Sequence, residues 1–350
     1  MSLTAYRTLG RSGLIVSPLA LGTMTFGTPR WGSANEVSEA IFHAYIEAGG
    51  NFVDTADVYA GGQSEELVGS YIADRYLRDQ VVLATKFAFN TSPGNPHAGG
   101  NGRKHIYQAL ESSLRRLKTD YVDLYWLHAW DMVTPVEEVL QTLGDLVRAG
   151  KIRYFGFSDM PAWYTAKAAT LAAVHGIPGP IAMQLEYSLV ERTIEYEYIP
   201  AAQELGLGIT PWSPLAAGFL AGKYQPEGAS AMGEGRLTGP NPFGNSKFTE
   251  RNWRVLDTLR TVAAQLDRSP AQVALAWVSK QPGVTSPILG ASKLEQLHDN
   301  LTSLEIRFTP DQLQTLNEAS APAAVFPYGI FTPAVNRSIF GGNTVQGWQQ

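Results

Sequence analysis

Three apolar runs decide how this chain folds: VVLATK (Val81–Lys86), VDLYWL (Val122–Leu127) and IRYFGF (Ile152–Phe157). Each run is short, rich in β-branched and aromatic residues, and typical of a buried strand. Between them lie two longer amphipathic segments, Lys104–Leu117 and Pro135–Ala149, which have the length and apolar spacing of helices. Strands that alternate with helices in this way predict consecutive βα units in a parallel sheet.

The same alternation extends in both directions along the 350 residues. Further strands are predicted at Pro18–Gly22, Phe52–Asp54, Ile181–Leu185, Gly208–Trp212 and Ser286–Leu289. Further helices are predicted at Asn35–Ala48, Ser64–Ala73, Ala162–Val174, Glu195–Leu205 and Pro270–Ser279, the last of them with Ser269 as its N-cap. Eight units in one chain favour a (β/α)₈ TIM barrel over an open sheet. We therefore predict a single domain over residues 1–350.

Four segments interrupt this order. Tyr6–Val16 carries two glycines in a turn and predicts an N-terminal β-hairpin that closes the floor of the barrel. Asn90–Gly102 and Tyr224–Ser246 are rich in Gly, Pro and Ser, and each follows a predicted strand, so we interpret them as long functional βα loops at the C-terminal face. The second loop is expected to act as a flap over a cofactor. The tail Phe326–Gln350 has no clear period, and we interpret it as a cover of the active site.

Composition narrows the classes of function. The net charge is −5 and no basic block is present, so nucleic acid is not an expected partner. The chain has no cysteine, which excludes disulfides and thiolate chemistry and fits the reducing cytoplasm, where we expect the protein to act. No apolar run approaches the roughly 18 residues of a membrane span, so no membrane partner is expected. The six histidines contain no HExxH pair, and no metal is expected.

Polar residues follow three neighbouring predicted strands. Asp54 and Tyr59 lie in DTADVY (54–59), Lys86 ends the next strand, and His128 follows the strand after that. Functional residues of α/β barrels cluster at the carboxyl ends of the strands, whereas a buried lysine or aspartate is unfavourable unless it is paired. Each residue alone could be an isolated polar residue at a strand end. The four together predict an active site.

At these residues the chain resembles the aldo-keto reductase superfamily, and most closely its bacterial branch, which also resembles the β subunits of voltage-gated potassium channels. The resemblance rests on LGTMTFG (21–27), DTADVY (54–59), ATKF (84–87), RRLKTDYVDLYWLH (115–128), GKIRYFGFSD (150–159), QLEYSL (184–189), PWSPLAAGFLAGKY (211–224) and LGASKLEQLHDN (289–300). It implies a (β/α)₈ barrel and the NADP(H)-dependent reduction of aldehydes or ketones, or the reverse oxidation of alcohols. The catalytic tetrad of the family falls on Asp54, Tyr59, Lys86 and His128.

The chemistry explains why these residue types are needed. Carbonyl reduction requires a proton for the oxygen, and the resemblance implies Tyr59 as its donor. A tyrosine has a pKa near 10 and is a weak acid unless its anion is stabilised. We expect Lys86 to lower the pKa of Tyr59, Asp54 to orient the lysine, and His128 to hydrogen-bond the carbonyl oxygen.

The resemblance also implies an extended dinucleotide across the top of the barrel, and the Rossmann fingerprint GxGxxG is indeed absent. Trp212 would stack on the nicotinamide and Ser158, Asp159 and Gln184 would meet its carboxamide, while Thr23, Met24 and Asp54 would line the ribose and nicotinamide side. The expected pyrophosphate contacts are Ser213, Pro214, Leu215, Ala216, Ala217 and Gly218, with positive charge from Lys223 and Arg236. The expected adenosine contacts are Gly290, Ser292, Gln296 and Asn300.

Two positions depart from the pattern of the superfamily. Asp159 stands where Asn is common, although a carboxylate can still accept a hydrogen bond from the carboxamide. Gln296 stands where Arg is usual, so Lys293 is the basic residue nearest to the expected 2′-phosphate.

The substrate pocket is expected above Tyr59 and His128. Its predicted walls are Met24, Trp31, Phe87 and Trp130, joined by Phe326 or Tyr328 from the tail, which suits aromatic or bulky apolar carbonyl compounds. One alternative function is an NADPH-binding, redox-sensing regulatory subunit with slow turnover. Another is a barrel of unrelated chemistry such as a glycosidase, for which Asp54 and Asp57 offer paired carboxylates.

Overall fold

The computed structural model describes residues 2–227, 230–233, 235–238 and 246–345. The chain divides into two compact units, residues 1–320 and residues 321–350. The described part of the second unit includes the short helix α11 (Pro333–Ile339). The predicted single domain and the predicted cover of the active site by residues 326–350 stay predictions.

The first unit is built on eight parallel strands in one sheet. They are β3 (Ala20–Gly22), β4 (Phe52–Asp54), β5 (Val82–Phe87), β6 (Val122–Leu127), β7 (Ile152–Ser158), β8 (Ala182–Gln184), β9 (Gly208–Ile209) and β12 (Ile288–Leu289). The order in the sheet is β12-β3-β4-β5-β6-β7-β8-β9. The Thr285 N–H donates to the Ile209 oxygen and the Ile288 N–H to the Pro211 oxygen, each over 2.8 Å, so the two ends of the sheet meet. The predicted (β/α)₈ barrel is confirmed.

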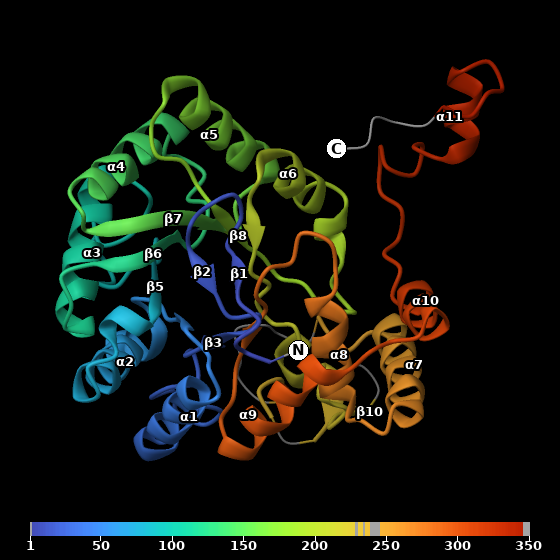
Figure 1. Cartoon of the computed structure of the whole chain (residues 1–350), viewed down its shortest axis with the longest axis horizontal. Coiled ribbons are helices and arrows are strands. Elements are labelled where there is room, and N and C mark those ends of the chain that lie inside the picture. The colour runs from blue at the N-terminus through green and yellow to red at the C-terminus, as the bar shows by residue number, and fades with distance from the viewer. Residues whose placement is uncertain (1, 228–229, 234, 239–245, 346–350) are drawn as a thin grey trace. The chain divides into compact units, whose positions relative to one another are not determined.

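Helices surround the strands (Figure 1). They are α1 (Asn35–Glu47), α2 (Gln63–Asp74), α3 (Arg103–Leu117), α4 (Val136–Arg148), α5 (Ala162–His175), α6 (Tyr198–Leu205), α7 (Glu250–Gln265), α8 (Pro270–Ser279), α9 (Leu294–Leu301) and α10 (Pro310–Ala319). The predicted N-cap of α8 is confirmed, because the Ser269 hydroxyl accepts from the Gln272 N–H, while the Gln272 side chain accepts from the Ser269 N–H. The sequence pattern had not singled out α7 and α10.

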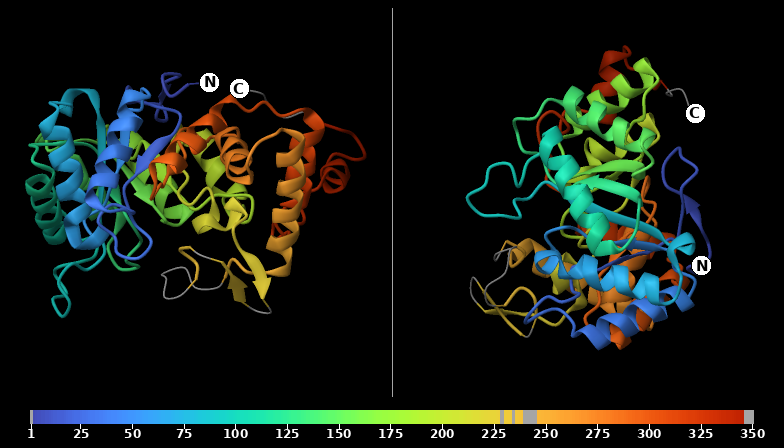
Figure 2. Two further views of the ribbon diagram at one scale, coloured as in Figure 1. Left: turned by 90° about the horizontal axis from the view of Figure 1, so that it is seen from below. Right: turned by 90° about the vertical axis from the view of Figure 1, so that its left-hand side faces the viewer.

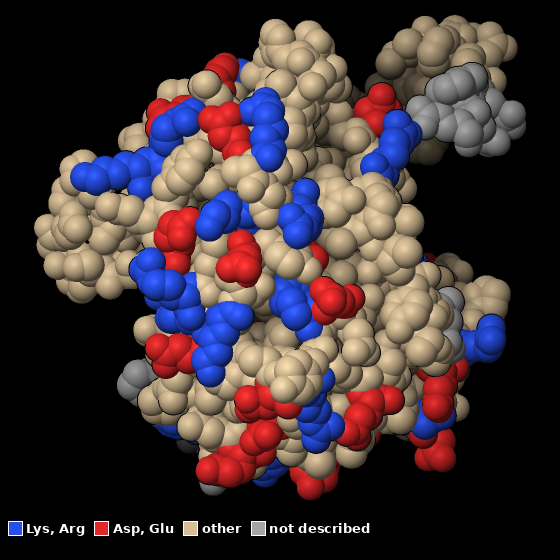
Figure 3. All heavy atoms as spheres, turned by 60° about the vertical axis from the view of Figure 1, so that its left-hand side comes forward, with Lys and Arg blue, Asp and Glu red and all other residues tan. Residues whose placement is uncertain are grey.

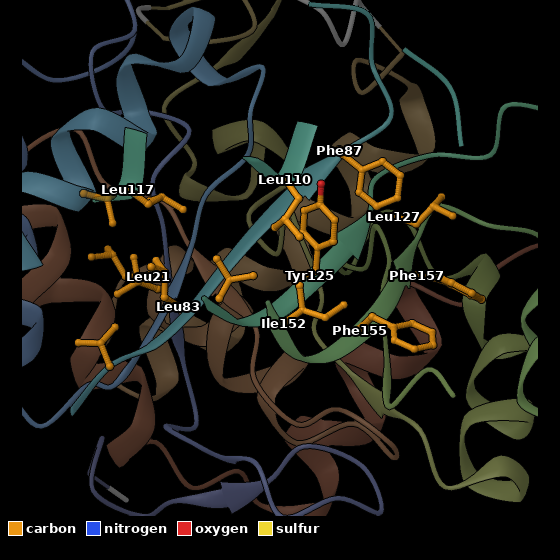
Figure 4. Close-up of a cluster of buried hydrophobic side chains, with 14 of the residues drawn as sticks. Leu21, Leu83, Phe87, Leu110, Leu117, Tyr125, Leu127, Ile152, Phe155 and Phe157 are labelled. Carbon is orange, nitrogen blue, oxygen red and sulfur yellow. The ribbon is translucent and has the colours of Figure 1, made fainter. Parts of the chain in front are cut away.

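Side chains along each strand alternate between the barrel interior and the surrounding helices, as the pleat requires. On β5, Val82 and Ala84 pack in the interior, whereas Leu83 and Phe87 belong to the apolar layer beneath the helices. Figure 4 shows part of this outer layer. Polar residues lie in the interior near the carboxyl ends of the strands. On β5, Lys86 faces inward like Val82 and Ala84 before it. The barrel therefore presents ionisable side chains such as Asp54 and Lys86 at the carboxyl ends of strands whose other inward residues are mostly apolar.

The N-terminal hairpin closes the opposite end. Its strands β1 (Arg7–Thr8) and β2 (Ile15–Val16) are antiparallel, and the buried Leu9, Leu14 and Val16 pack with interior residues of the barrel. Figure 2 shows this hairpin at one end of the barrel, while the loops after β5 and β9 project from the other end. The predicted hairpin at the floor is confirmed.

The long loop after β9 contains secondary structure of its own. The segment begins with the 3₁₀ helix η4 (Ala216–Ala221) and continues into an antiparallel pair, β10 (Gln225–Glu227) and β11 (Ser230–Met232). Residues 228–229, 234 and 239–245 of the predicted flap lie outside the described residues. Its role as a flap stays a prediction.

The surface of the protein carries charges of both signs. On the face drawn in Figure 3, lysines and arginines alternate with aspartates and glutamates.

Within the described part of the chain, no helix is both long and apolar enough to cross a membrane.

The contact of the hairpin with the barrel floor predicts a strong effect of Gly10→Ala. Gly10 has a φ of +61°, and a Cβ there would clash with the Ile181 oxygen and lie 2.7 Å from the Gly208 nitrogen. We expect strain and crowding to lower the free energy of unfolding by about 2–4 kcal/mol, measured by urea denaturation.

Gly13→Ala in the same hairpin is the matched control. The nearest atom to its Cβ would be the Tyr154 hydroxyl at 3.7 Å, an ordinary contact. The control is expected to change stability by less than about 0.5 kcal/mol. Equal effects of the two substitutions would contradict the proposed packing of the hairpin.

Candidate active site

Four polar side chains meet where β4, β5 and β6 end. Asp54 is the last residue of β4, Lys86 precedes the last residue of β5, and His128 directly follows β6. Tyr59 begins the 3₁₀ helix η1 (Tyr59–Gly62) in the loop after β4. Because the three strands are parallel neighbours, their carboxyl ends lie side by side. The structure thus brings together the four residues predicted as a tetrad.

Lys86 is the centre of this group. Its side chain has no exposed surface, and its ammonium donates to the Asp54 carboxylate, to the Thr55 oxygen over 2.7 Å and to the Tyr59 hydroxyl over 3.2 Å. Burial alone would lower the pKa of Lys86, but the attraction of Asp54 and the contact with Tyr59 outweigh burial and raise it. Lys86 therefore stays positively charged.

Tyr59 keeps its proton in this environment. Burial raises the pKa of Tyr59 above its usual range, while the Lys86 ammonium acts in the opposite direction. Lys86 thus acts on the pKa of Tyr59 in the expected direction, but the desolvation of the phenolate is larger, so the net pKa is raised. A protonated hydroxyl is the form that can donate a proton to an oxygen.

His128 lies against the tyrosine ring. The two ring centroids are 6.0 Å apart and the rings are nearly perpendicular. Burial, together with the charge of Lys86, holds the pKa of His128 well below its ordinary value, so the imidazole is neutral. Among the described residues, the buried Nδ1 of His128 has no hydrogen-bond partner.

A chain of hydrogen bonds links the tetrad to the opposite side of the barrel. The Gln184 amide donates to Asp54 Oδ1 over 3.0 Å, the Asp159 N–H donates to the Gln184 oxygen over 3.1 Å, and the Trp212 indole donates to Asp159 Oδ1 over 3.1 Å. Ser158, the last residue of β7, is buried beside this chain. Four residues predicted at the nicotinamide thus lie together.

The segment after β9 bends sharply. Ser213, Ala216, Ala217 and Gly218 all have positive φ angles between +49° and +92°, a strained conformation for residues other than glycine that is concentrated at functional sites. Ala217 donates its N–H to the Ser213 hydroxyl over 3.0 Å. Pro214 and Leu215 lie within the same bend. The predicted pyrophosphate segment therefore forms one compact turn.

Two lysines converge beside this turn. A Cβ on Gly218 would lie 3.5 Å from Lys223 Nζ, so the ammonium packs against the bend. Burial and the nearby charge of Lys293 lower the pKa of Lys223. Two adjacent cations favour an anionic group between them.

The predicted adenosine contacts lie along the segment from the end of β12 to the last turn of α9. Gln296 accepts from the Ser292 N–H over 2.9 Å and from its hydroxyl over 3.3 Å. Gln296 is exposed, whereas Asn300 is buried. A side chain at Gly290 would meet open space.

Met24, Trp31 and Arg236, which were predicted to contact the cofactor or the substrate, form a cluster. The Arg236 guanidinium lies 4.2 Å over the Trp31 ring and contacts Met24 Sδ at 2.9 Å. Arg236 reaches this position from the loop after β9. Its positive charge acts on Tyr59 and opposes the rise in the pKa of that residue. The structure thus places Arg236 with the predicted substrate wall.

The Thr23 side chain makes its hydrogen bonds within the protein. It has no exposed surface, and its hydroxyl bonds the Asp54 oxygen over 3.2 Å and the Ser64 hydroxyl over 2.8 Å. Thr23 therefore ties the ends of β3 and β4 to helix α2, and its expected contact with the cofactor stays a prediction.

The prediction of Phe87 as a pocket wall is corrected. It is fully buried and stacks on Tyr125 at 4.7 Å in the layer beneath the helices (Figure 4), so it does not line the pocket. Its place is taken by Phe89, which sequence analysis missed and which packs edge-on against His128 at 4.9 Å. Trp130 is half-buried and packs edge-on against Trp163 at 5.8 Å.

The described residues contain no group of three His, Cys, Asp or Glu side chains that could hold a metal ion. Residues 18–321 match the model of the aldo/keto reductase family. This range ends one residue beyond the first compact unit.

Individual relatives match over most of their length. The chain is 35% identical over 334 residues, 91% of this chain and 86% of the relative, to an aryl-alcohol dehydrogenase [NADP(+)] of Phanerodontia chrysosporium. It is 33% identical over 325 residues, 90% of this chain and 81% of the relative, to a norsolorinic acid reductase of Aspergillus flavus. It is also 37% identical over 306 residues, 86% of this chain and 91% of the relative, to a probable voltage-gated potassium channel subunit beta of Oryza sativa subsp. japonica.

The buried pair predicts a large loss of stability in Asp54→Asn. The substitution leaves the fully buried Lys86 without a counter-charge, which is expected to lower the free energy of unfolding by about 3–5 kcal/mol in urea denaturation. Asp145→Asn is the control, because Asp145 pairs with Arg103 and Arg148 at the surface and is expected to contribute less than about 1 kcal/mol. A small effect at both positions would show that Lys86 is not held as a buried cation.

Proposed function

Because the chain belongs to the aldo/keto reductase family, we propose that it uses NADP(H) to interconvert carbonyl compounds and alcohols, with Tyr59 as the general acid and base. The observation that carries this proposal is the buried Lys86 ammonium, whose hydrogen bonds join Asp54, Thr55 and Tyr59. A buried cation beside a protonated phenol is suited to a reaction in which the phenol gives up its proton.

Each member of the tetrad has a separate task. The Tyr59 hydroxyl donates to the carbonyl oxygen and transfers its proton as negative charge develops there. Lys86 stabilises the tyrosinate that remains, and Asp54 keeps Lys86 charged and in place. The neutral His128 donates a second hydrogen bond to the same oxygen and directs the carbonyl toward the centre of the barrel.

The chemistry of the barrel mouth suits NADP(H). The bend at Ala216–Gly218, with Lys223 and Lys293 beside it, suits the phosphates, and the Ser292 hydroxyl supplies a further donor. The half-buried Trp212 offers a flat apolar face for an aromatic ring. When bound, the cofactor supplies the hydride for the carbonyl carbon.

The substrate is proposed to be an aromatic aldehyde or ketone, or the matching alcohol. Met24, Trp31, Phe89 and Trp130 provide aromatic and thioether surfaces around the mouth of the barrel. Two relatives are named for aryl alcohols and for norsolorinic acid, which agrees with an aromatic substrate. Oxidation of NADPH with a panel of aliphatic, sugar and aryl carbonyl compounds tests this proposal.

The similarity to a potassium channel β subunit supports a second candidate, an NADPH-binding redox sensor. An enzyme must release oxidised cofactor between turnovers, whereas a sensor profits from retaining it. Stopped-flow measurement of cofactor release distinguishes the two. Release much slower than one per minute, together with no productive carbonyl in the panel, would favour the sensor.

Tyr59→Phe removes only the proposed proton donor. We expect kcat to fall by about 10³-fold, because general acid catalysis contributes about 10²–10⁴-fold, while the Kd for NADPH changes by less than about threefold. Steady-state kinetics and calorimetric titration measure the two quantities.

Tyr125→Phe is the matched control for this substitution. The Tyr125 hydroxyl is also buried near the site but has no hydrogen-bond partner among the described residues, so its removal is expected to leave kcat unchanged. A Tyr59→Phe variant with near-native kcat would refute Tyr59 as the donor.

Lys293→Ala tests the preference for NADP(H) over NAD(H). Lys293 is exposed, so its attraction for the 2′-phosphate is screened and its loss should reduce the preference by about fivefold at low salt and less at high salt. The preference is the ratio of Kd values for NADH and NADPH. Lys167→Ala, which removes an exposed lysine paired with Glu137, is the control. Equal affinity of the native protein for NADH and NADPH would overturn the assignment.

A further inference from the structure

Asp159 places a carboxylate at the mouth of the barrel, outside the tetrad. It directly follows β7, and its backbone adopts a φ of +47°, which turns the side chain out of the strand register. The carboxylate accepts from the Trp212 indole over 3.1 Å, and the Asp159 N–H donates to the Gln184 oxygen. Both partners hold Asp159 at one edge of the indole ring.

The surroundings of Asp159 decide its charge. Solvent reaches its side chain, yet protein atoms surround it closely enough that burial raises the pKa of Asp159 to about 6. The Trp212 hydrogen bond and Lys86 oppose this rise, and Glu186 adds to it. Asp159 is therefore a carboxylate at neutral pH and loses its charge in mild acid.

The position of Trp212 brings Asp159 close to the reacting atoms. Lys86, which hydrogen-bonds Tyr59, also interacts electrostatically with Asp159. An aromatic ring that stacks on Trp212 would lie about 3.5 Å from the indole plane and therefore roughly 4–6 Å from a carboxylate bound to the indole N–H. Any charge that appears on the stacked ring acts directly on Asp159.

The proposed reaction changes the charge of that ring. A hydride, with both electrons of its C–H bond, passes to the carbonyl carbon, and the carbonyl oxygen takes the Tyr59 proton. The carbonyl is reduced to an alcohol, and the neutral dihydronicotinamide is oxidised to a cation. A carboxylate at this distance attracts the oxidised ring and has no comparable attraction for the reduced ring.

On the basis of the proposed function, we propose that Asp159 makes this protein bind NADP⁺ in preference to NADPH. The preference pulls the equilibrium between the bound reactants toward alcohol and NADP⁺, because a group that stabilises one bound state shifts the equilibrium toward it. It also slows the release of NADP⁺. Asp159 thus acts as a specificity residue for the oxidation state of the cofactor.

Asp159→Asn tests the proposal with little change in shape, because the amide oxygen can still accept from Trp212. Calorimetric titration at pH 8 measures the Kd values of NADP⁺ and NADPH separately. We expect the Kd of NADP⁺ to rise about tenfold, allowing for solvent screening, and that of NADPH to change by less than about twofold. Glu186→Gln is the matched control, since Glu186 is already paired with Lys247 over 2.6 Å and its removal should leave the ratio of the two Kd values unchanged.

The unmodified protein provides a second, independent measurement. Between pH 8 and pH 5.5 the ratio of Kd for NADPH to Kd for NADP⁺ should fall toward the value for Asp159→Asn, because protonation removes the charge. The 2′-phosphate titrates in the same range, but both cofactor forms carry it, so its effect cancels in the ratio. Lys86 and Tyr198, which also face Asp159, have raised pKa values and do not titrate there, while the Glu186→Gln variant isolates Glu186.

Two outcomes would overturn the proposal. A ratio that Asp159→Asn leaves unchanged would show that the carboxylate does not sense the charge of the ring. An equal loss of affinity for both forms would show that Asp159 only positions the cofactor. Both outcomes leave the proposed function intact, whereas failure of the native protein to bind either form would overturn the proposed function as well.

Discussion

The burial of the Lys86 ammonium constrains the end of the barrel at which the carboxyl ends of the strands lie. Lys86 has no contact with solvent, and a charge in that position is tolerated only with a close counter-charge and full hydrogen bonding. Asp54 supplies the charge and is itself fixed by Gln184 from the far side of the barrel. The hydrogen bond to the Tyr59 hydroxyl is the third that the ammonium donates, after those to Asp54 and Thr55. Strands β4, β5 and β8 must therefore keep their register for the tetrad to exist.

The sequence contains most of the information needed to predict this arrangement. Strand pairing follows from apolar runs, and the pleat then determines which residues face inward: Val82, Ala84 and Lys86 on β5, for example. The same rule shows why Phe87 is not a pocket residue, since the neighbour of an inward lysine must face the helices. The prediction of Phe87 as a wall considered proximity along the chain and neglected the alternation.

Other features depend on backbone turns that the residue types do not reveal. Ala88 has a φ of +139°, which breaks the alternation after β5 and brings Phe89 against His128. Asp159 leaves its strand with a φ of +47° and reaches Trp212, more than fifty positions later in the chain. Neither contact has a local sequence signal, because positive φ angles are uncommon for residues other than glycine and the residue type alone does not predict them. The net rise in the pKa of Tyr59 likewise required the burial of the folded site.

The electrostatics of the site suit a reaction that moves a proton and a hydride at the same time. The charges of Lys86 and Asp54 offset each other and His128 is neutral, so a tyrosinate would leave the tetrad with one net negative charge, held beside the Lys86 ammonium. In the proposed reaction, Asp159, which is ionised at neutral pH, would face the positive charge on a ring stacked against Trp212. The lysine would stabilise the anion left by proton transfer, and the aspartate would stabilise the cation left by hydride transfer. Because Lys86 and Asp159 are each held by hydrogen bonds of the folded site, each would stabilise its charge without rearrangement of the barrel.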